Sequence, residues 1–473
     1  PIALVNSLLI SATNTAGYFT DPNASVVASL ADTGVFTAPV GGGNHYLAAV
    51  SSYRGIGIAL SDPQLAAEIA SRTTFPPAAL SGVVSFPSPL VLRPQVPRNI
   101  GAPDLGYHYS AVDVLATGLE PSGGLILTNG VVVACAGTSG VRVPSGDYSI
   151  PFVSQGTAEK PNRIVWQGTV QEQALTTGAA PGSRSLIEQP YTAATTPSLT
   201  LRFTDTSLMS DDGWILYLGS TFNLIVASLD AKDCQFHGGQ LRMGPNTPGM
   251  GVWLQNNLFE WTTVAMNQNA SINGTQPFTL TMRNNTFKAG TLASAMVSFS
   301  KQSAVTTWTV KANLFDSVVS GSVGSGVTIA NTHNAYRSGA TQLPGAANSK
   351  VITTFNYLVG PFGSYYYGIP SSAGTLNDLD GAGDVSPASA GLKHHTVNGT
   401  TRAKDVNSLV AIGMHYVAMD PSSVVFDGDQ DGMPDYLEDA NGNGTTDSGE
   451  TNWQSYTSAN GLSSPVAIVP WRP

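Results

Sequence analysis

The chain has 473 residues, of which only 11% are charged, whereas an average soluble domain has about 25%. Its net charge is -10, but nine of its 31 acids lie between residues 420 and 450; without them, 22 acids stand against 21 Lys and Arg. This near-neutral remainder offers no basic field for nucleic acid, and no apolar run reaches the roughly 18 residues that a membrane helix needs. We therefore expect neither a nucleic-acid partner nor a membrane span. Few charges and many small polar residues favour extracellular β structure.

The N-terminal region carries two local signals. Residues 2–9 (IALVNSLL) have the pattern of a solenoid coil, so the chain, which begins at Pro1 without an initiator Met, is expected to be processed or excised from a longer precursor. An uncapped coil exposes strand edges that invite pairing with another chain. Further on, residues 62–72 predict a short helix with Asp62 as its N-cap and Pro63 in its first turn.

The only two cysteines are Cys135 and Cys234. Two cysteines are too few for a disulfide scaffold. Because sequence separation does not fix the distance between their Cβ atoms, a bridge between them stays open at this stage.

The middle of the chain contains a repeat of 23 to 28 residues. Each copy alternates apolar and polar residues, then has a polar turn and an aromatic residue: 229–236 (LDAKDCQF), 252–259 (VWLQNNLF), 280–287 (LTMRNNTF), 308–315 (WTVKANLF) and a degenerate copy at 327–336. One short strand and one turn per copy predict an all-β fold, a right-handed parallel β-helix.

Equivalent positions of the copies form columns down this solenoid. Two residues before the aromatic residue stand Cys234, Asn257, Asn285 and Asn313, and stacked amides there would bond one another and the turn backbone. Directly after the aromatic residue stand His237, Glu260, Lys288 and Asp316, which predict a ladder of surface ion pairs.

A mainly basic column lies four residues before the aromatic residue. It contains Lys232, Gln255, Arg283 and Lys311. We expect it to be a solvated outer face, and the alternative is a stripe that grips an anionic glycan.

A second, longer repeat joins 105–113 (LGYHYSAVD) to 412–420 (IGMHYVAMD), 307 positions later. The shared G-x-H-Y motif contains His108 and His415, for which we expect packing, with the imidazole bonded to nearby backbone, rather than a metal or catalytic role. His394 and His395 are adjacent, so in a strand they would point to opposite faces and could not share an ion.

The sequence offers one candidate cluster for catalysis and one candidate segment for a further cation, and each has a simpler explanation. A polysaccharide lyase or hydrolase would need a basic residue beside a carboxylate, or two close carboxylates. Asp230, Lys232 and Asp233 form the best such cluster, and a surface ion pair accounts for them; an enzyme is therefore left open but not favoured. The stretch that holds Asn377, Asp378, Asp380 and Asp384 lacks the closing Glu of a calcium loop, so an exposed turn is expected there.

Two calcium-type loops run end to end near the C-terminus. Their residues occupy loop positions 1, 3, 5, 7, 9 and 12, with the backbone carbonyl as the ligand at position 7: Asp427, Asp429, Asp431, Met433, Asp435 and Glu438 in the first, and Asp439, Asn441, Asn443, Thr445, Asp447 and Glu450 in the second. Gly432 and Gly444 at position 6 permit the sharp turn. We therefore expect calcium as the cofactor, with a tighter first site because it has five carboxylates against three.

The G-x-H-Y pair, the segment SQGTAEKP with Ser154, Gly156, Thr157 and Pro161, and the loop sequence DGDQDGMPDYLEDANGNG together resemble uncharacterised, very large secreted β-helix proteins of bacteria. The resemblance implies the fold and secretion, and carries no catalytic residues with it. It divides the chain into the end of a first helical unit (1–113), a second unit (114–420), the calcium loops (421–452) and a β-prone tail (453–473).

These observations favour a secreted, non-catalytic calcium-binding β-solenoid, a structural protein of a cell surface or an extracellular matrix. Its open first coil, and the apolar segment 464–471 (SPVAIVPW), suggest head-to-tail self-association into a filament, in which calcium loops rigidify the end of the rod. The alternative is a glycan-binding adhesin or a polysaccharide lyase or hydrolase on the same scaffold.

Overall fold

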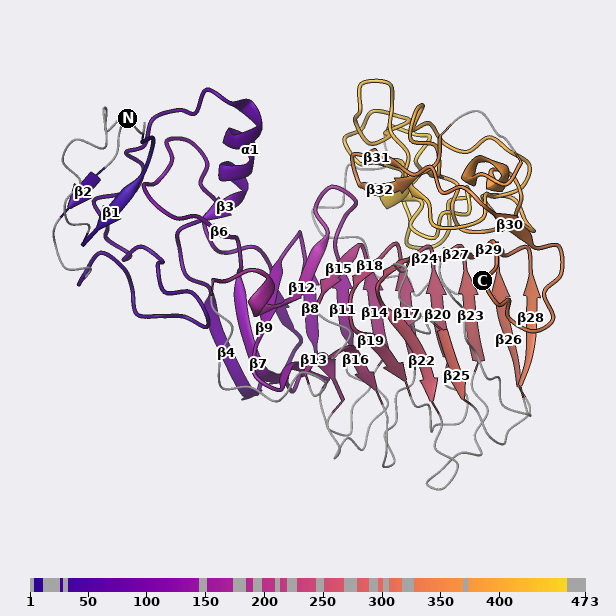
Figure 1. The fold of residues 1–473 in the computed structure, drawn as a ribbon, viewed down its shortest axis with the longest axis horizontal. Helices are drawn as coiled ribbons and strands as arrows, with labels where there is room; N and C mark the ends of the chain where they lie inside the picture. The colour runs from indigo at the N-terminus through magenta and orange to yellow at the C-terminus, as the bar shows by residue number, and fades with distance from the viewer. Residues whose placement is uncertain are drawn as a thin grey trace.

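The structure is a computed structural model, and it describes residues 4–11, 26–28, 33–143, 151–172, 184–189, 198–208, 213–218, 228–243, 251–267, 279–288, 297–300, 306–316, 327–368 and 373–456. Short strands stack in parallel along one axis, each beside the strand one coil earlier and one coil later (Figure 1). The expected all-β parallel solenoid is thereby confirmed.

Three parallel sheets run along this solenoid, and all pairings within them are parallel. The first contains β4 (Ala78–Val84), β7 (Val114–Pro121), β9 (Val132–Cys135), β12 (Asn162–Trp166), β15 (Thr204–Ser207), β18 (Gln235–His237), β21 (Leu258–Glu260), β24 (Thr286–Lys288), β27 (Leu314–Asp316), β29 (Ala335–Arg337) and β30 (Lys350–Ile352). The second contains β5 (Leu90–Leu92), β8 (Leu125–Thr128), β11 (Phe152–Gln155), β14 (Ser198–Arg202), β17 (Ser228–Lys232), β20 (Gly251–Gln255), β23 (Thr279–Arg283), β26 (Thr306–Lys311) and β28 (Val327–Thr332). The third contains β10 (Ser139–Arg142), β13 (Arg184–Glu188), β16 (Gly213–Leu218), β19 (Gln240–Met243), β22 (Thr263–Asn267) and β25 (Val297–Ser300), and β7 also pairs with β10.

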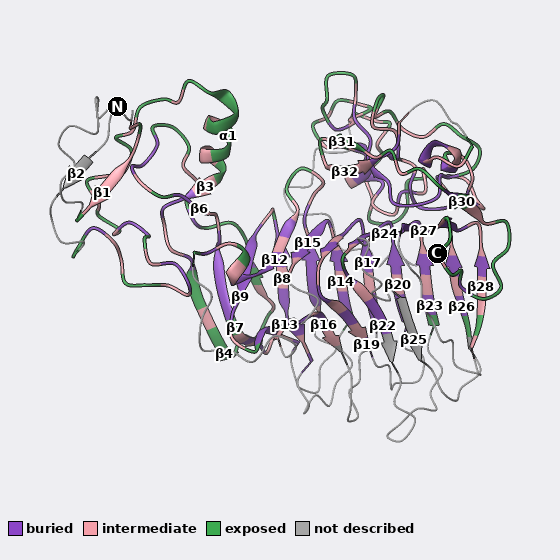
Figure 2. Ribbon diagram, in the orientation of Figure 1, coloured by how far each residue is buried: buried purple, intermediate pink, exposed green. Residues whose placement is uncertain are grey.

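The repeat of the sequence is the coil of this solenoid. Its aromatic residues are buried and stack ring on ring, with centroids 5.0 Å apart from Phe236 to Phe259, 4.7 Å to Phe287, 5.0 Å to Phe315 and 5.1 Å to Tyr336. These rings belong to one continuous apolar core that runs the length of the solenoid (Figure 2). Alternate residues of each strand face this core, which is why the copies share an apolar, polar, apolar pattern.

The asparagine column forms the predicted ladder at the turn between the second and first sheets. The Asn257 backbone N–H and Nδ2 both donate to Asn285 Oδ1 at 3.0 Å, and the same two groups of Asn285 donate to Asn313 Oδ1 at 3.0 and 2.9 Å. Asn313 continues the ladder to Asn334, in the degenerate copy. All four asparagines are fully buried, so each coil satisfies the polar groups of the next.

Outside the solenoid, the structure contains β1 (Leu8–Ile10), β2 (Val26–Ala28), α1 (Pro63–Ser71), β3 (Arg72–Thr73), β6 (Tyr109–Ser110), the 3-10 helices η1 (Gln167–Thr169) and η2 (Leu376–Leu379), the hairpin β31 (Leu358–Gly360) and β32 (Gly363–Tyr366), β33 (His395–Thr396), β34 (Tyr416–Val417) and α2 (Asp435–Glu438). The helix expected at 62–72 is confirmed, and Asp62 caps it by accepting hydrogen bonds from Gln64 N at 2.8 Å and Leu65 N at 3.2 Å. No helix among the described residues is both long and apolar enough to cross a membrane. Cys135 and Cys234 are separate, buried thiols, so the bridge left open by the sequence is not formed.

Residues 353–368 and 373–456 leave the coil and fold back along one flank of the solenoid; we call them the flanking module (Figure 1). The sequence predicts a second helical unit over residues 114–420. The first sheet ends with β30, so the described part of this range after residue 352 belongs to the flanking module instead of the coils. Conversely, β4 and β5 pair with β7 and β8 and so extend the sheets upstream of residue 114. The tail segment 464–471 lies outside the described residues.

Candidate metal centre

The first calcium-type loop brings Asp427, Asp429 and Asp431 together, with one carboxylate oxygen of each within 4.8 Å of the others. The loop is held by its own backbone: Gln430 N and Gly432 N donate to the two oxygens of Asp427, at 2.8 and 3.0 Å. Gly432 has φ +96°, a conformation that a residue with a Cβ atom adopts only at a cost. Position 6 is therefore glycine for the reason that the sequence indicates.

The three carboxylates are unfavourably placed in two ways: they repel one another, and one of their oxygens lacks a hydrogen bond. Asp429 Oδ2 is shielded from solvent and makes no hydrogen bond to any described residue. Burial and the neighbouring carboxylates of Asp431 and Asp427 raise the pKa of Asp429. A cation among these oxygens would remove both penalties, so the residues present fit an oxygen-seeking metal ion.

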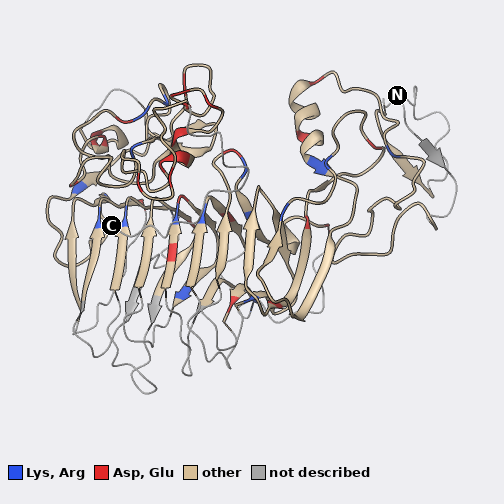
Figure 3. Cartoon of the chain, turned by 180° about the vertical axis from the view of Figure 1, so that it is seen from behind, with Lys and Arg blue, Asp and Glu red and all other residues tan. Residues whose placement is uncertain are grey.

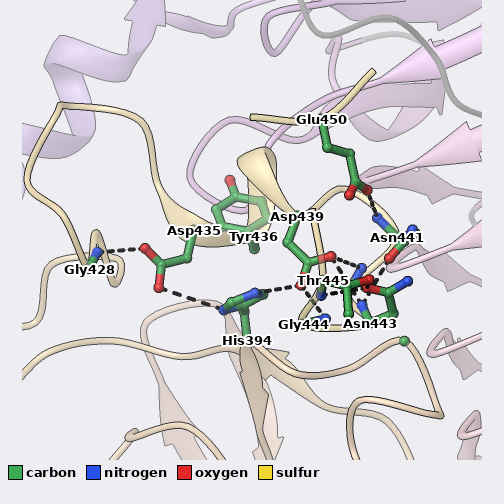
Figure 4. A network of polar contacts seen from close by, with 12 residues as sticks. His394, Gly428, Asp435, Tyr436, Asp439, Asn441, Asn443, Gly444, Thr445 and Glu450 are labelled. Carbon is green, nitrogen blue, oxygen red and sulfur yellow. Dashed lines mark hydrogen bonds and ion pairs between the residues drawn. The ribbon is translucent and has the colours of Figure 1, made fainter. Parts of the chain in front are cut away.

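The group of carboxylates whose oxygens lie within 4.8 Å of one another does not include Asp435 or Glu438, at positions 9 and 12 of this loop. Both lie in α2 and are buried. Asp435 is paired with Lys404 Nζ and accepts a hydrogen bond from Gly428 N at 2.5 Å, and His394 Nδ1 lies 3.7 Å away (Figure 4). Lys404 itself lies over the rings of Phe426 and Trp453. Of the predicted first-loop side chains, the structure thus gathers three.

The second loop is closed by hydrogen bonds among its predicted residues (Figure 4). Asp439 accepts from the N–H groups of Gly442, Asn443 and Gly444 at 2.9, 3.1 and 2.7 Å. Asp447 accepts from the amide nitrogens of Asn441 and Asn443, both at 2.7 Å, and Glu450 accepts from Asn441 N at 3.0 Å. Thr445 donates to Asn443 Oδ1 at 2.7 Å through its backbone N–H and at 2.6 Å through its hydroxyl. This loop therefore folds as a unit whose polar side chains converge.

Both loops are docked on the flank of the solenoid. The expectation that they lie at the end of the rod is therefore wrong. Tyr436 accepts a hydrogen bond from Ala158 N at 3.0 Å through its hydroxyl and one from Arg202 Nη2 at 3.2 Å through its carbonyl. Its ring packs edge-on against Phe203, at 5.2 Å between centroids. These contacts lie in the coils of β11 and β14, far from the last coil at β28 to β30.

The basic column is covered by the flanking module, so the expected solvated face is wrong, and the column is not free to grip a glycan. Lys232 is 4% exposed and donates to the carbonyls of Gly391 at 3.0 Å and Asn441 at 3.1 Å. Arg283 binds both oxygens of Asp384 at 2.6 and 3.1 Å, and Lys311 Nζ lies 3.2 Å from the same carboxylate. Figure 3 shows Lys and Arg at the ends of solenoid strands that face the module, and Asp and Glu within the module. Burial lowers the pKa of Lys232 to about 8.

This contact also corrects the expectations for two acidic segments. Asp384, which we had placed in an exposed turn, has a side chain only 8% exposed. Asp233 belongs to the cluster for which the sequence predicts a surface location, but its side chain is 2% exposed. His395 Nε2 lies 3.3 Å from its Oδ1, and Arg202 Nε lies 3.5 Å from its Oδ2. Burial opposes ionisation of Asp233, but these neighbours and Lys232 hold its pKa below the usual range.

Two steps of the other predicted ladder are present along the first sheet. His237 Nδ1 lies 2.8 Å from Glu260, and Lys288 Nζ lies 2.8 Å from Asp316, which also binds Arg337. Asp316 is fully buried, because Tyr357 of the flanking module covers it and donates to it at 3.1 Å. Two ion pairs of the predicted column are therefore formed, and the pair at Asp316 belongs to the module interface instead of the surface.

The two G-x-H-Y motifs dock on solenoid-like turns in the same way. Gly106 N donates to Asn6 O at 3.0 Å, and Gly413 N donates to Ala312 O at 2.8 Å. The accepting residues both have left-handed backbone, with φ 51° and 53°, and the two glycines have φ +97° and +100°. Each histidine bonds the carbonyl of its own glycine at 2.9 Å, which confirms the packing prediction for His108 and His415.

His394 and His395 point to different partners, as predicted. His394 Nε2 lies 2.8 Å from Asp439 Oδ2 in the second loop, whereas His395 faces Asp233 of the solenoid. Sequence reasoning missed Lys404 and Tyr436, which join the loops to their surroundings. Neither belongs to a repeat, so no column could have revealed it.

No protein-family model, no curated protein and no solved structure matches this chain.

Proposed function

We propose that this chain is a secreted calcium-binding β-solenoid that serves as a structural protein of a bacterial cell surface or extracellular matrix. The observation that carries the proposal is the convergence of Asp427, Asp429 and Asp431, with a shielded Asp429 oxygen that lacks a hydrogen-bond partner, in a loop docked on the solenoid. Carboxylate oxygens in this arrangement suit calcium. The same proposal includes a right-handed coil, because about 98% of parallel strand crossovers have that hand.

Calcium would act by folding the module onto the rod. Residues 427–450 carry eight acids, whose mutual repulsion opposes a compact loop segment without a cation. The loops share a cluster of contacts with the solenoid through Tyr436 and Asn441. Cation binding would therefore stabilise the flank contact along with the loops.

Calcium titration by calorimetry tests this proposal. We expect binding to the wild-type protein, with the first loop tighter than the second, and loss of the tighter phase in Asp429→Asn. Glu68→Gln, a charge removal in the exposed helix α1, serves as the matched control and should leave both phases unchanged. Absence of calcium binding at millimolar concentration would contradict the proposal.

Self-association into head-to-tail filaments is the second part of the proposal. Its support is the parallel architecture, in which each coil leaves backbone groups for the next one to pair with. Negative-stain electron microscopy should show fibres with a regular axial repeat in calcium. Short single rods in calcium would remove this part and leave the calcium proposal standing.

A further inference from the structure

A pocket of about 490 Å³ lies where the flanking module meets the solenoid, separate from the calcium loops. Its solenoid side comes from turns beside β11, β14 and β17, and its module side from the β31–β32 hairpin, β33 and the second G-x-H-Y motif. Its volume falls within the roughly 300–1,000 Å³ of small-molecule sites, which often form where two structural units meet.

The lining of this pocket is both acidic and aromatic. Three carboxylates from three successive coils line it, from Glu159, Asp205 and Asp233. No Lys or Arg is among its described lining residues, and the nearest ones, Arg163 and Arg202, lie outside the lining beside Asp205 and Asp233. Aromatic rings of Phe203, Phe362 and Tyr416 form part of its wall. Carboxylates attract a cation, and ring faces stabilise it further.

Two buried acceptors in the pocket lack a donor. His395 is 2% exposed, and neither of its ring nitrogens makes a hydrogen bond to any residue that the structure describes. Because Asp233 lies 3.3 Å from Nε2, the proton of the neutral ring belongs on Nε2, which leaves Nδ1 as an acceptor. Asp205 Oδ1 is likewise shielded from solvent and makes no hydrogen bond within the described chain; His237 Nε2 lies 3.6 Å from it, and Arg163 Nε lies 3.4 Å from the other oxygen.

Buried acceptors without donors cost free energy, and a bound molecule that donates to them would recover it. We propose that this pocket binds a small primary amine in its ammonium form, up to the size of a monosaccharide. An ammonium group has three N–H donors and a full positive charge, so it satisfies the acceptors, the acidic lining and the aromatic wall together. A polyol of the same size would supply donors but not the charge.

The experiment compares three amines with one neutral sugar on the full chain, in saturating calcium. D-glucosamine, ethanolamine and putrescine are the cations, and D-glucose is the neutral counterpart of glucosamine. Ligand-observed NMR should show saturable binding of at least one amine, at least tenfold tighter than glucose. Glu159→Gln, at an exposed position of the rim, and Asp205→Asn should each weaken that amine at least tenfold, whereas Glu68→Gln should not.

Three results would overturn the proposal: equal binding of glucose and glucosamine, no saturable binding of any of the three amines, or unchanged affinity in both pocket variants. If Asp205→Asn does not fold, Glu159→Gln decides the outcome alone. The pocket lies between the module and the solenoid, so every probe is measured in saturating calcium. The preference for an amine over glucose, and its loss in the pocket variants, then report on the pocket, whereas the calcium titration reports on the loops.

Discussion

The inner and outer sides of one corner of the solenoid are built from neighbouring residues but make different contacts: the inner side bonds adjacent coils, and the outer side bonds the flanking module. Asn285 faces inward and bonds Asn257 and Asn313, its equivalents one coil away on either side. Asn284, the preceding residue, has φ 54° and faces outward, where its amide donates to Ala411 O at 2.8 Å, 127 residues along the chain. The inner column therefore holds the rod together, and the outer column holds the flanking module on the rod.

This difference explains why the outer residues look ordinary in the sequence. An inner residue bonds the equivalent residue of the next coil. The same residue type must therefore recur in successive coils, and this recurrence is visible as a sequence repeat. An outer residue needs partners only in a segment that does not repeat. These partners change along the column: Gly391 and Asn441 for Lys232, Ala390 for Gln255, and Asp384 for both Arg283 and Lys311. From the sequence alone such a column has the pattern of a solvated stripe, because only the folded structure shows which residues it contacts.

The largest effect should come from breaking the inner column. Asn285→Ala removes the acceptor of two buried Asn257 donors and the donor to Leu254 O, at about 1–3 kcal/mol for each group left unsatisfied, so we expect a loss of about 4 kcal/mol in the free energy of unfolding. The matched change Asn284→Gly removes one outward bond without backbone strain and should cost about 1 kcal/mol. Denaturant unfolding of both variants measures the contrast; equal losses would contradict the division of labour between the columns.

An intermediate effect should come from the glycine of the second G-x-H-Y motif. A Cβ atom at Gly413 would lie 2.3 Å from Tyr367 Oη and 3.3 Å from Leu314 Cβ, at φ +100°. Backbone strain and overpacking together predict that Gly413→Ala costs about 3 kcal/mol or more.

Gly101 provides the control, because it has φ +101° but no atom within 4 Å of its Cβ position. Gly101→Ala should therefore show the strain alone, about 1–2 kcal/mol. Thermal unfolding of the two variants separates the cost of backbone strain from the cost of overpacking. Equal destabilisation would mean that the Gly413 contact with the solenoid does not constrain the module.

The smallest effect should come from Asp384 and should depend on pH. Burial raises its pKa, but the bonds from Arg283 and Lys311 outweigh burial and lower it below the ordinary 3.8. A carboxylate with a lowered folded-state pKa stabilises the fold above pH 3.8 and loses that contribution as the pH falls through its folded-state value. Asp384→Asn should therefore cost about 2 kcal/mol at pH 7 and converge with the wild type in acid. A gap that stays constant from pH 7 to pH 2 would show that the ion pair is not the source.

Much of the fold could be predicted because it repeats. The aromatic stack, the asparagine ladder and the helix capped by Asp62 follow from local patterns. The flank contact could not be predicted, because Lys232 and Asp384 carry no sign of the buried, non-repeating partners that pair with them. For the same reason the spacing of Asp435, which fits a calcium ligand, does not reveal that the folded module pairs this residue with Lys404.

Hydrogen exchange with mass spectrometry, in calcium and in chelator, tests the central claim most directly. If calcium folds the loops onto the rod, removing it should speed exchange in residues 384–456 and leave the coils of β20, β23 and β26 unchanged. Identical exchange of the loop segment in both conditions would contradict the claim that calcium holds the module on the solenoid.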